Sequence, residues 1–481
     1  MRLIGLILYA SLLSSIAGNH TNAQEKKVRF SLKTDGASVL SDEFRETMDI
    51  PGFSVENKSL DIIASKEYFE RFKGMGFDVT LLETQRSGPD AAYLNHDEIA
   101  QIINSLSSQY PDIIHVKKIG ESLMGRPIYA VRLTAPENIQ AKPAVLFNSM
   151  HHAREIMTPE VTVDLMIYLA TNYNNLEKPW VNEWLENLSI WIVPQVNPDG
   201  NKIVWEQDSW WRKNGRAENN RPYGVDLNRN YPYEWGACNG SSGNRSSATF
   251  RGDSAGSEPE TQALMNFITS ENILLDISYH SYSELVIAPY GCQGSYTPEK
   301  GVVDEIGQKL ASVLERDNGS PGYTYGTGWE ILYPVDGDDI SWMYQENNTI
   351  AYVIEVNSSS QGFQPSYEKW REKTVERQRR GWKYLLHRAM KGPQVRGRIT
   401  DALTGKPIDG NLKIANVEYH KEKARRSKDG VFYKLLAPGS YDLVFEATGY
   451  EPQTISISIG DSPVMWDVAM MPTSLGNKWG F

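Results

Sequence analysis

The chain of 481 residues contains only two cysteines and has no excess of positive charge. Two cysteines are too few for a disulfide-stapled scaffold or for a structural four-cysteine zinc site. A formal net charge of −11 argues against nucleic acid as the main partner, because phosphate binding needs clustered positive charge. The chain also lacks internal repeats and low-complexity tracts. With 40% hydrophobic and 23% charged residues, it is typical of a globular protein of about three domains.

Long apolar runs are also scarce. Arg2 precedes a nearly all-apolar stretch, Leu3–Leu13, which is too short to span a bilayer, and small residues follow it up to Ala23. We therefore expect a signal peptide over residues 1–23 and a secreted or periplasmic protein. No other stretch approaches the ~20 apolar residues of a membrane helix, so we expect no membrane span.

The apolar pattern divides the rest of the chain into three units. Residues 27–85 read as a small α+β unit, with strands expected over 28–32, 59–64 and 77–82 and helices over 42–48 and 66–73. Residues 394–472 show short strands between Gly- and Pro-rich turns, which is typical of a β-sandwich. Its expected strands are 395–400, 412–417, 430–435, 441–448 and 453–459.

The middle unit, residues 91–391, alternates apolar runs with helical stretches. This pattern predicts an α/β domain with a mixed, mainly parallel sheet flanked by helices. The expected strands are 144–148, 189–194, 274–279 and 350–354, and the expected helices are 96–110, 159–173, 258–270, 302–316 and 367–390.

Three of these strands lead into residues that can bind a metal. The strand over 144–148 is followed by His151, His152 and Glu155, the strand over 274–279 by His280, and the strand over 350–354 by Glu355. The carboxyl ends of parallel strands meet at one edge of a sheet, where sites form. Two imidazoles and one carboxylate with an open fourth position make a catalytic zinc set, and a further carboxylate can act as general base. By spacing alone, Glu155 pairs equally well with His151 or His152.

Arginines lie between these motifs. Arg212 and Arg216 come first, and Asp226, Asn228 and Arg229 follow. An arginine beside a zinc site can grip a substrate carboxylate with its fork of donors or stabilise an oxyanion. An aspartate such as Asp226 can orient a zinc-bound histidine. Taken alone, these arginines are also typical of a solvated surface.

In this order and context, the motifs resemble those of the zinc metallocarboxypeptidases of the pancreatic carboxypeptidase A/B family, especially its secreted bacterial members. The resemblance covers residues 93–390. The motifs that carry it are His152-Ala153-Arg154-Glu155, Asn228-Arg229-Asn230, His280-Ser281-Tyr282-Ser283, Pro289-Tyr290-Gly291 and Glu355. It implies a zinc carboxypeptidase fold, one Zn²⁺ and removal of C-terminal residues from peptides or proteins.

The resemblance also implies a role for each matching residue. His152, Glu155 and His280 would bind zinc, and Glu355 would act as general base and then general acid. Asn228 and Arg229 would bind the terminal carboxylate of the substrate, Tyr333 would close over it, Arg154 would lie beside the cleft, and Asp226 would support a zinc histidine. Arg216 is expected to hold the oxyanion. The segment from Arg212 to Arg216 has one residue more than the pancreatic enzymes, so Arg212 is the alternative.

The expected specificity is hydrophobic or broad. Ile340 occupies the position that is aspartate in the enzymes that prefer basic ends, which favours hydrophobic terminal residues. Asp336, Asp338 and Asp339 lie in the same loop and could receive Lys or Arg, or could instead form a solvated turn or a calcium loop.

The flanking units also have likenesses. Residues 27–85 resemble the pro-domains of this family, with a possible cut near Arg86, and residues 394–472 resemble the transthyretin-like domain of regulatory carboxypeptidases, read as a stabilising or docking module. Cys238 and Cys292 pair in one interpretation and stay free in another. The protein is expected to be a monomer. The competing hypotheses are a cell-wall peptidase or a deacylase on the same fold, and a catalytically silent binding protein.

Overall fold

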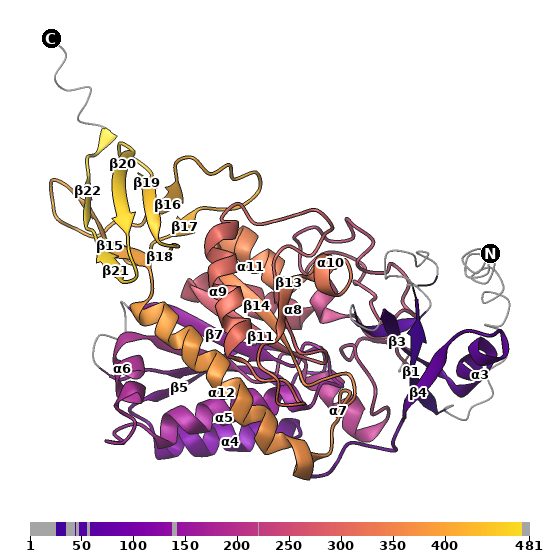
Figure 1. Ribbon diagram of the computed structural model, residues 1–481. Coiled ribbons are helices and arrows are strands. Elements are labelled where there is room, and N and C mark those ends of the chain that lie inside the picture. The colour runs from indigo at the N-terminus through magenta and orange to yellow at the C-terminus, as the bar shows by residue number, and fades with distance from the viewer. Residues whose placement is uncertain are drawn as a thin grey trace.

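The computed structural model describes residues 26–34, 44, 48–54, 58–136, 142–219 and 221–473. The expected signal peptide and most of the expected helix over 42–48 lie outside these ranges. Three units follow one another along the chain, and the first and last flank the large central one (Figure 1). Within the described ranges, no helix has the length and apolarity that crossing a membrane requires.

The central unit is built on a mixed eight-stranded sheet. Its strand order is β13-β12-β14-β11-β7-β8-β6-β5. Four neighbouring strands, β14, β11, β7 and β8, run parallel, whereas the β8/β6, β6/β5 and β14/β12 pairs are antiparallel. The bounds are β5 Ile114–Glu121, β6 Pro127–Leu133, β7 Ala144–Ser149, β8 Ser189–Val193, β11 Leu275–Ser281, β12 Leu285–Ala288, β13 Thr324–Thr327 and β14 Ile350–Val356. The predicted fold class is thereby confirmed.

Helices cover both faces of this sheet. Along β7, Val145 and Phe147 belong to one buried cluster and Leu146 to another, because side chains alternate across a strand. The first face is covered by α4 His96–Gln109, α5 Met157–Thr171, α6 Pro179–Asn187, α9 Lys300–Val313 and α12 Tyr367–Lys391. The second is covered by α8 Pro259–Glu271 and α11 Asp339–Asn347. The strands are buried on both sides, which explains their continuous apolar runs.

The N-terminal unit is a small sheet with one described helix against it. The strand order is β2-β3-β1-β4, with β1 Lys27–Lys33, β2 Asp49–Ser54, β3 Ser59–Ser65 and β4 Val79–Thr84. Helix α3, Lys66–Gly74, packs Phe69 and Phe72 against Phe30 of β1. The edge strand β2 reaches toward the central unit.

The C-terminal unit consists of two small sheets that enclose one core. β18-β15-β21 with β22 form the first sheet, and β17-β16-β19-β20 form the second. The bounds are β15 Gln394–Asp401, β16 Asn411–Ile414, β17 Arg425–Arg426, β18 Val431–Leu435, β19 Gly439–Glu446, β20 Gln453–Ile459, β21 Pro463–Met465 and β22 Val468–Met470. Phe432 and Phe445 pack edge to face inside, as the expected sandwich requires.

Candidate active site

Two histidines and a glutamate converge at the carboxyl edge of the sheet. His152 Nδ1 lies 2.8 Å from Glu155 Oε1, and His280 Nδ1 lies 3.1 Å from both Glu155 Oε2 and His152 Nδ1. All three side chains are buried. His152 and Glu155 come from the turn between β7 and α5, and His280 comes from β11. Three donor atoms that face one point can hold one metal ion.

Buried partners fix the orientation of these ligand candidates. His152 Nε2 lies 3.1 Å from Asp226 Oδ1, so Nδ1 faces the group. Burial would raise the pKa of Asp226, but Arg212 and His152 outweigh it and hold the pKa well below its usual range. Burial would likewise raise the pKa of Glu155, yet the two histidines lower it. Both carboxylates are therefore ionised, which suits a cation.

His151 belongs to a different cluster. Its Nε2 lies 2.9 Å from the hydroxyl of Tyr231 and 3.7 Å from Asp339 Oδ2. With His280 it forms a second group of possible metal ligands. Burial lowers the pKa of His151 to about 4, so its ring is neutral at pH 7. On geometry, the pair with Glu155 is therefore made by His152, and His151 stacks on the far side of His280.

Glu355 lies beside the metal-ligating group. His280 and Glu355 are register partners on the parallel strands β11 and β14, so both side chains point to the same side of the sheet. Burial, and then the negative charge of Glu155, raise the pKa of Glu355 to about 8. A carboxyl with a raised pKa beside a metal-ligating group can take up and release a proton at neutral pH.

The two arginines of the 212–216 segment diverge. The Arg212 Nε donates to Asp226 Oδ2 at 3.0 Å, and Arg212 lines the same cavity as Glu355. Arg216 instead pairs with Glu258 at 2.8 Å, is 30% exposed and does not line that cavity. Arg216, the residue expected to hold the oxyanion, therefore lies away from this cavity, and the alternative, Arg212, lines it. The buried Glu258 carboxylate draws Arg216 away, and Arg212 takes the position beside the ligands.

One cavity joins these groups to the remaining expected residues Asn228, Arg229, Tyr333 and Ile340. Asn228 and Arg229 lie in a 3-10 turn, η3 Leu227–Arg229, which is capped by Asp226. The residues that line the cavity are Pro51, His152, Glu155, Arg212, Asn228, Arg229, His280, Ser281, Ile287, Ala288, Gly291, Gly328, Leu332, Tyr333, Val335, Asp338, Ile340, Val353 and Glu355. The lining therefore combines the metal-ligating group, Glu355 and two arginines with apolar residues such as Ile287, Leu332, Ile340 and Val353.

Two of the three loop aspartates point elsewhere. Asp336 accepts hydrogen bonds from the backbone N–H groups of Cys238 and Gly240, and Asp339 is buried near His151. Only Asp338 lines the cavity, where it also caps α11 through the Ser341 N–H at 2.9 Å. Burial raises the pKa of Asp338 to about 6. The sequence suggested these three aspartates but could not distinguish among them.

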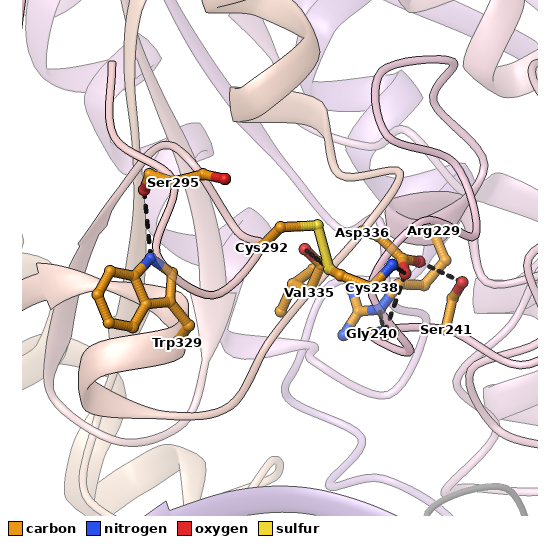
Figure 2. The surroundings of a disulfide bond; sticks show 9 residues. All are labelled: Arg229, Cys238, Gly240, Ser241, Cys292, Ser295, Trp329, Val335 and Asp336. Carbon is orange, nitrogen blue, oxygen red and sulfur yellow. Dashed lines mark hydrogen bonds between the residues drawn. A yellow bond between two sulfur atoms is a disulfide. The ribbon is translucent and has the colours of Figure 1, made fainter. Parts of the chain in front are cut away.

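A disulfide between Cys238 and Cys292 fixes the wall of the cavity (Figure 2). Cys238 Sγ also contacts the Val335 carbonyl, and the Arg229 Nε donates to the Gly240 carbonyl at 2.9 Å. Gly291, next to Cys292, has room for no side chain, since a Cβ there would lie 2.3 Å from the Val335 oxygen. This pairing was one of the two interpretations of the cysteines. Its importance for the cavity was not visible in the sequence.

The N-terminal unit reaches into the cleft. Arg154, which is 1% exposed, donates from Nη2 to Asp49 Oδ1 at 2.9 Å and through Nη1 to the other carboxylate oxygen. Arg154 lines a neighbouring cavity with Arg212, and Pro51 of β2 lines the cavity of the ligand group. Asp61 accepts a 2.7 Å hydrogen bond from the hydroxyl of Tyr282, which directly follows β11 and belongs to the motif of His280.

Comparison with known proteins identifies relatives of the chain. The zinc carboxypeptidase family model matches residues 99–379. Carboxypeptidase O of Bos taurus is 30% identical over 265 residues, which cover 54% of this chain and 69% of that protein. The metallocarboxypeptidase A-like protein of Trichophyton verrucosum is 30% identical over 326 residues, 66% of this chain and 71% of that protein. The crystal structure of carboxypeptidase A from Helicoverpa armigera shares the fold, with a TM-score of 0.64 at 21% identity over 76% of this chain and 97% of that one.

Proposed function

Because the chain belongs to the zinc carboxypeptidase family and is a zinc-dependent peptide hydrolase, we propose that it removes single residues from the C-termini of peptides and proteins. The observation that carries the proposal is the composition of one cavity. It holds Arg229 and Asn228, which can bind a free carboxylate, beside Glu355 and the metal-ligating group, and it ends in apolar walls. A free carboxylate that pairs with Arg229 would place a chain terminus beside Glu355 and the metal-ligating group.

The residues of the ligand group fit a zinc ion. His152, Glu155 and His280 offer the two imidazoles and one carboxylate that catalytic zinc sites use, and they leave one side open toward the cavity. Asp226 accepts from the far nitrogen of His152, an arrangement that sets the tautomer of a metal-bound histidine. Zinc bound there would supply a Lewis acid for the scissile carbonyl and lower the pKa of a bound water.

Residues of the chain bind the substrate, transfer the proton and stabilise the charge that develops on the carbonyl oxygen. Arg229 and Asn228 hold the terminal carboxylate of the substrate, and Tyr333 closes over it. Glu355 takes the proton of the attacking water and passes it to the departing amine. Arg212 stabilises the negative charge on the carbonyl oxygen, since its guanidinium is fixed by Asp226 beside Glu155. Asp226 keeps both Arg212 and His152 in place.

The terminal side chain enters the apolar end of the cavity. Ile287, Leu332, Ile340 and Val353 form most of the wall there, which favours hydrophobic terminal residues. Asp338 adds one carboxyl group that can accept a hydrogen bond or a cation. The resulting preference is broad, with apolar residues favoured and Lys or Arg accepted when Asp338 is ionised.

Residues 27–85 act as a pro-region in this proposal. Two contacts support this role: Pro51 lines the cavity, and Asp49 pairs with Arg154. Both contacts fill space that an extended substrate would need. The exposed Arg86 follows this unit and offers a site for a trypsin-like protease. The apolar stretch Leu3–Leu13 after Arg2 supports export of the chain.

A peptide-library digest read by mass spectrometry tests the proposed function. The chain is used uncut and after cleavage at Arg86, with and without a zinc chelator, beside Glu355→Gln. We expect loss of single C-terminal residues, abolished by the chelator and by the substitution. Cleavage inside peptides, or release of amino-terminal residues, would contradict the proposal. Activity only on cell-wall peptides would favour the alternative peptidase.

A further inference from the structure

One loop of the C-terminal sandwich reaches back to the central domain. The loop comprises residues 415–424 and connects β16 to β17. From it, Tyr419 donates its hydroxyl hydrogen to Glu299 Oε1 at 2.7 Å, and Glu422 accepts the hydroxyl hydrogen of Tyr290 at 2.8 Å. The sandwich is therefore in direct contact with the neighbourhood of the cavity, although its own residues contribute nothing to the cavity lining.

Tyr290 connects this loop to the wall of the cavity. It is 2% exposed and packs between the rings of Tyr233 and Tyr344. It immediately precedes Gly291, which lines the cavity and contacts Val335 closely. Burial and the nearby Glu422 raise the pKa of the Tyr290 phenol, so it remains a hydrogen-bond donor at all physiological pH values. The Tyr290 hydroxyl thus joins the Gly291 wall to Glu422, and it also hydrogen-bonds the phenol of Tyr233.

The same loop holds the second wall element. Helix α11 places Ile340 in the cavity at its first turn, while its last turn carries Gln345 and Glu346. The side-chain Nε2 of Gln345 donates to the Lys421 carbonyl at 2.6 Å. The main-chain carbonyl of Gln345 accepts from the Lys423 N–H at 2.7 Å. Lys423 also pairs with Glu346. One loop thus contacts two parts of the cavity wall, Tyr290 next to Gly291 and the helix that carries Ile340.

Buried polar contacts hold the sandwich firmly in this place. Lys434 of β18 is 2% exposed and pairs with Glu299 of the central domain at 2.5 Å. Arg425, which is buried, donates to the carbonyls of Ile273 at 2.6 Å and Asn272 at 2.7 Å. Separation of the two units would leave these charges without partners, so the sandwich and the central domain behave as one body. The loop therefore acts on the cavity wall from a fixed base.

We propose that the sandwich domain sets the shape of the terminal side-chain pocket, and that Glu422 is a positioning residue that acts through Tyr290. The inference rests on the proposed function, because it assigns the apolar end of the cavity to the terminal side chain. Glu422 touches no substrate. Its carboxylate holds the Tyr290 hydroxyl, which keeps Gly291 against Val335 and the pocket at the width that a large side chain needs.

The test compares substitutions within one loop. Glu422→Ala removes the acceptor, whereas Glu422→Gln keeps an amide oxygen that can accept the phenol hydrogen. Glu418→Ala is the matched control, because Glu418 lies in the same loop with its side chain 83% exposed. Tyr290→Phe removes the donor. Two peptides that differ only in a terminal Phe or a terminal Ala serve as substrates for the form of the chain that is active in the digest.

We expect Glu422→Ala to raise KM for the Phe-terminated peptide about tenfold, which corresponds to loss of a hydrogen bond to a charged group. The kcat for this peptide, and both kcat and KM for the Ala-terminated peptide, should stay nearly unchanged. Tyr290→Phe should reproduce this split, and the double substitution should add nothing to it. Glu422→Gln and Glu418→Ala should resemble the unsubstituted chain. If Glu422→Ala fails to fold, Tyr290→Phe carries the test.

Two results would overturn the inference. The first is a Glu422→Ala variant that discriminates between the Phe- and Ala-terminated peptides as strongly as Glu418→Ala does. If only the tyrosine variant folds, the same comparison is made between Tyr290→Phe and Glu418→Ala. The second is a Glu422→Gln variant as impaired as Glu422→Ala. An unsubstituted chain that releases neither terminal residue would instead contradict the proposed function, so the two failures are distinguishable.

Discussion

At the scale of single residues, Arg212 and Arg216 differ by the acid that each one binds. Arg212→Gln should lower kcat/KM by about 10²–10³, the usual cost of one oxyanion donor, because Arg212, unlike Arg216, lines the cavity beside Glu155. The measurement is steady-state kinetics on one peptide, with zinc content determined in parallel. Bound zinc should stay stoichiometric, which separates loss of the donor from displacement of Asp226 and His152.

Arg216→Gln is the matched variant. It leaves the buried Glu258 without its cation, so we expect a loss of about 1–3 kcal/mol in the free energy of unfolding and little change in rate. Denaturant unfolding and kinetics on the same peptide measure both. A rate loss in Arg216→Gln that matched that of Arg212→Gln would return the oxyanion role to Arg216.

The preference for a terminal Lys over a terminal Leu should depend on pH through Asp338. The pKa of this carboxyl is raised to about 6, so it is neutral below that pH and ionised above it. Release of a terminal Lys relative to a terminal Leu should therefore increase between pH 5 and pH 7.5. Asp338→Asn should abolish the increase while still capping α11, since asparagine caps as well as aspartate. A ratio that rises equally in Asp338→Asn would exclude this carboxyl as the cause.

Residues next to strand ends could be predicted from the sequence, and residues placed by distant partners could not. Glu155, His280 and Glu355 follow buried apolar runs, and the topology brings such strand ends together. The choice between Arg212 and Arg216 depends on Glu258, 42 residues further along, and no local pattern reports that pair. His152 was chosen over His151 by resemblance, and its orientation depends on Asp226, 74 residues away.

At the scale of elements, the disulfide and the loop that contains Val335 form one support for the cavity wall. Replacing Cys238 and Cys292 together by Ser should cost about 2–4 kcal/mol in the free energy of unfolding, because the bond closes a separation of 54 residues. KM should rise as well, since the Gly240 carbonyl that orients Arg229 lies beside Cys238. Denaturant unfolding and KM, compared with the unsubstituted oxidised chain, check both. An unchanged KM would separate the disulfide from the site.

The central strands were predictable because strands that are buried on both faces have continuous apolar runs in the sequence. The long helices were predictable from their helical apolar periodicity. Strand β2 was not expected. Its sequence, Asp-Ile-Pro-Gly-Phe-Ser, contains two residues that weaken strands, and it forms only because it is an edge strand with an irregular register. The expected strand over 412–417 ends at Ile414, where the loop that contacts Tyr290 begins. In both places, pairing and loop contacts beyond the local segment override local propensity.

At the scale of the whole molecule, the two flanking units contact the same cavity region from different elements. The N-terminal unit brings Pro51 to the cavity, and the sandwich supports its wall through Glu422. The first contact is made by an edge strand of a small unit joined through an exposed linker, which suits a removable part. The second unit follows α12 directly through two buried residues, 392–393, and pairs Lys434 with Glu299, which suits a permanent part.

This difference predicts how the uncut chain responds to Asp49→Asn. Arg154 is 1% exposed and stacks on Phe363, so loss of the Asp49 charge leaves a buried cation poorly paired. The cost, about 2–5 kcal/mol, falls on the docking of the N-terminal unit, so activity of the uncut chain should rise at least tenfold. Initial rates on a peptide, before and after cleavage at Arg86, measure this activation, and the cut forms should be equally active.

Asp78→Asn is the control, because Asp78 pairs with Lys33 in the same unit but is 66% exposed, where an ion pair contributes little. An uncut Asp49→Asn chain no more active than uncut Asp78→Asn would show that this ion pair does not restrain the enzyme.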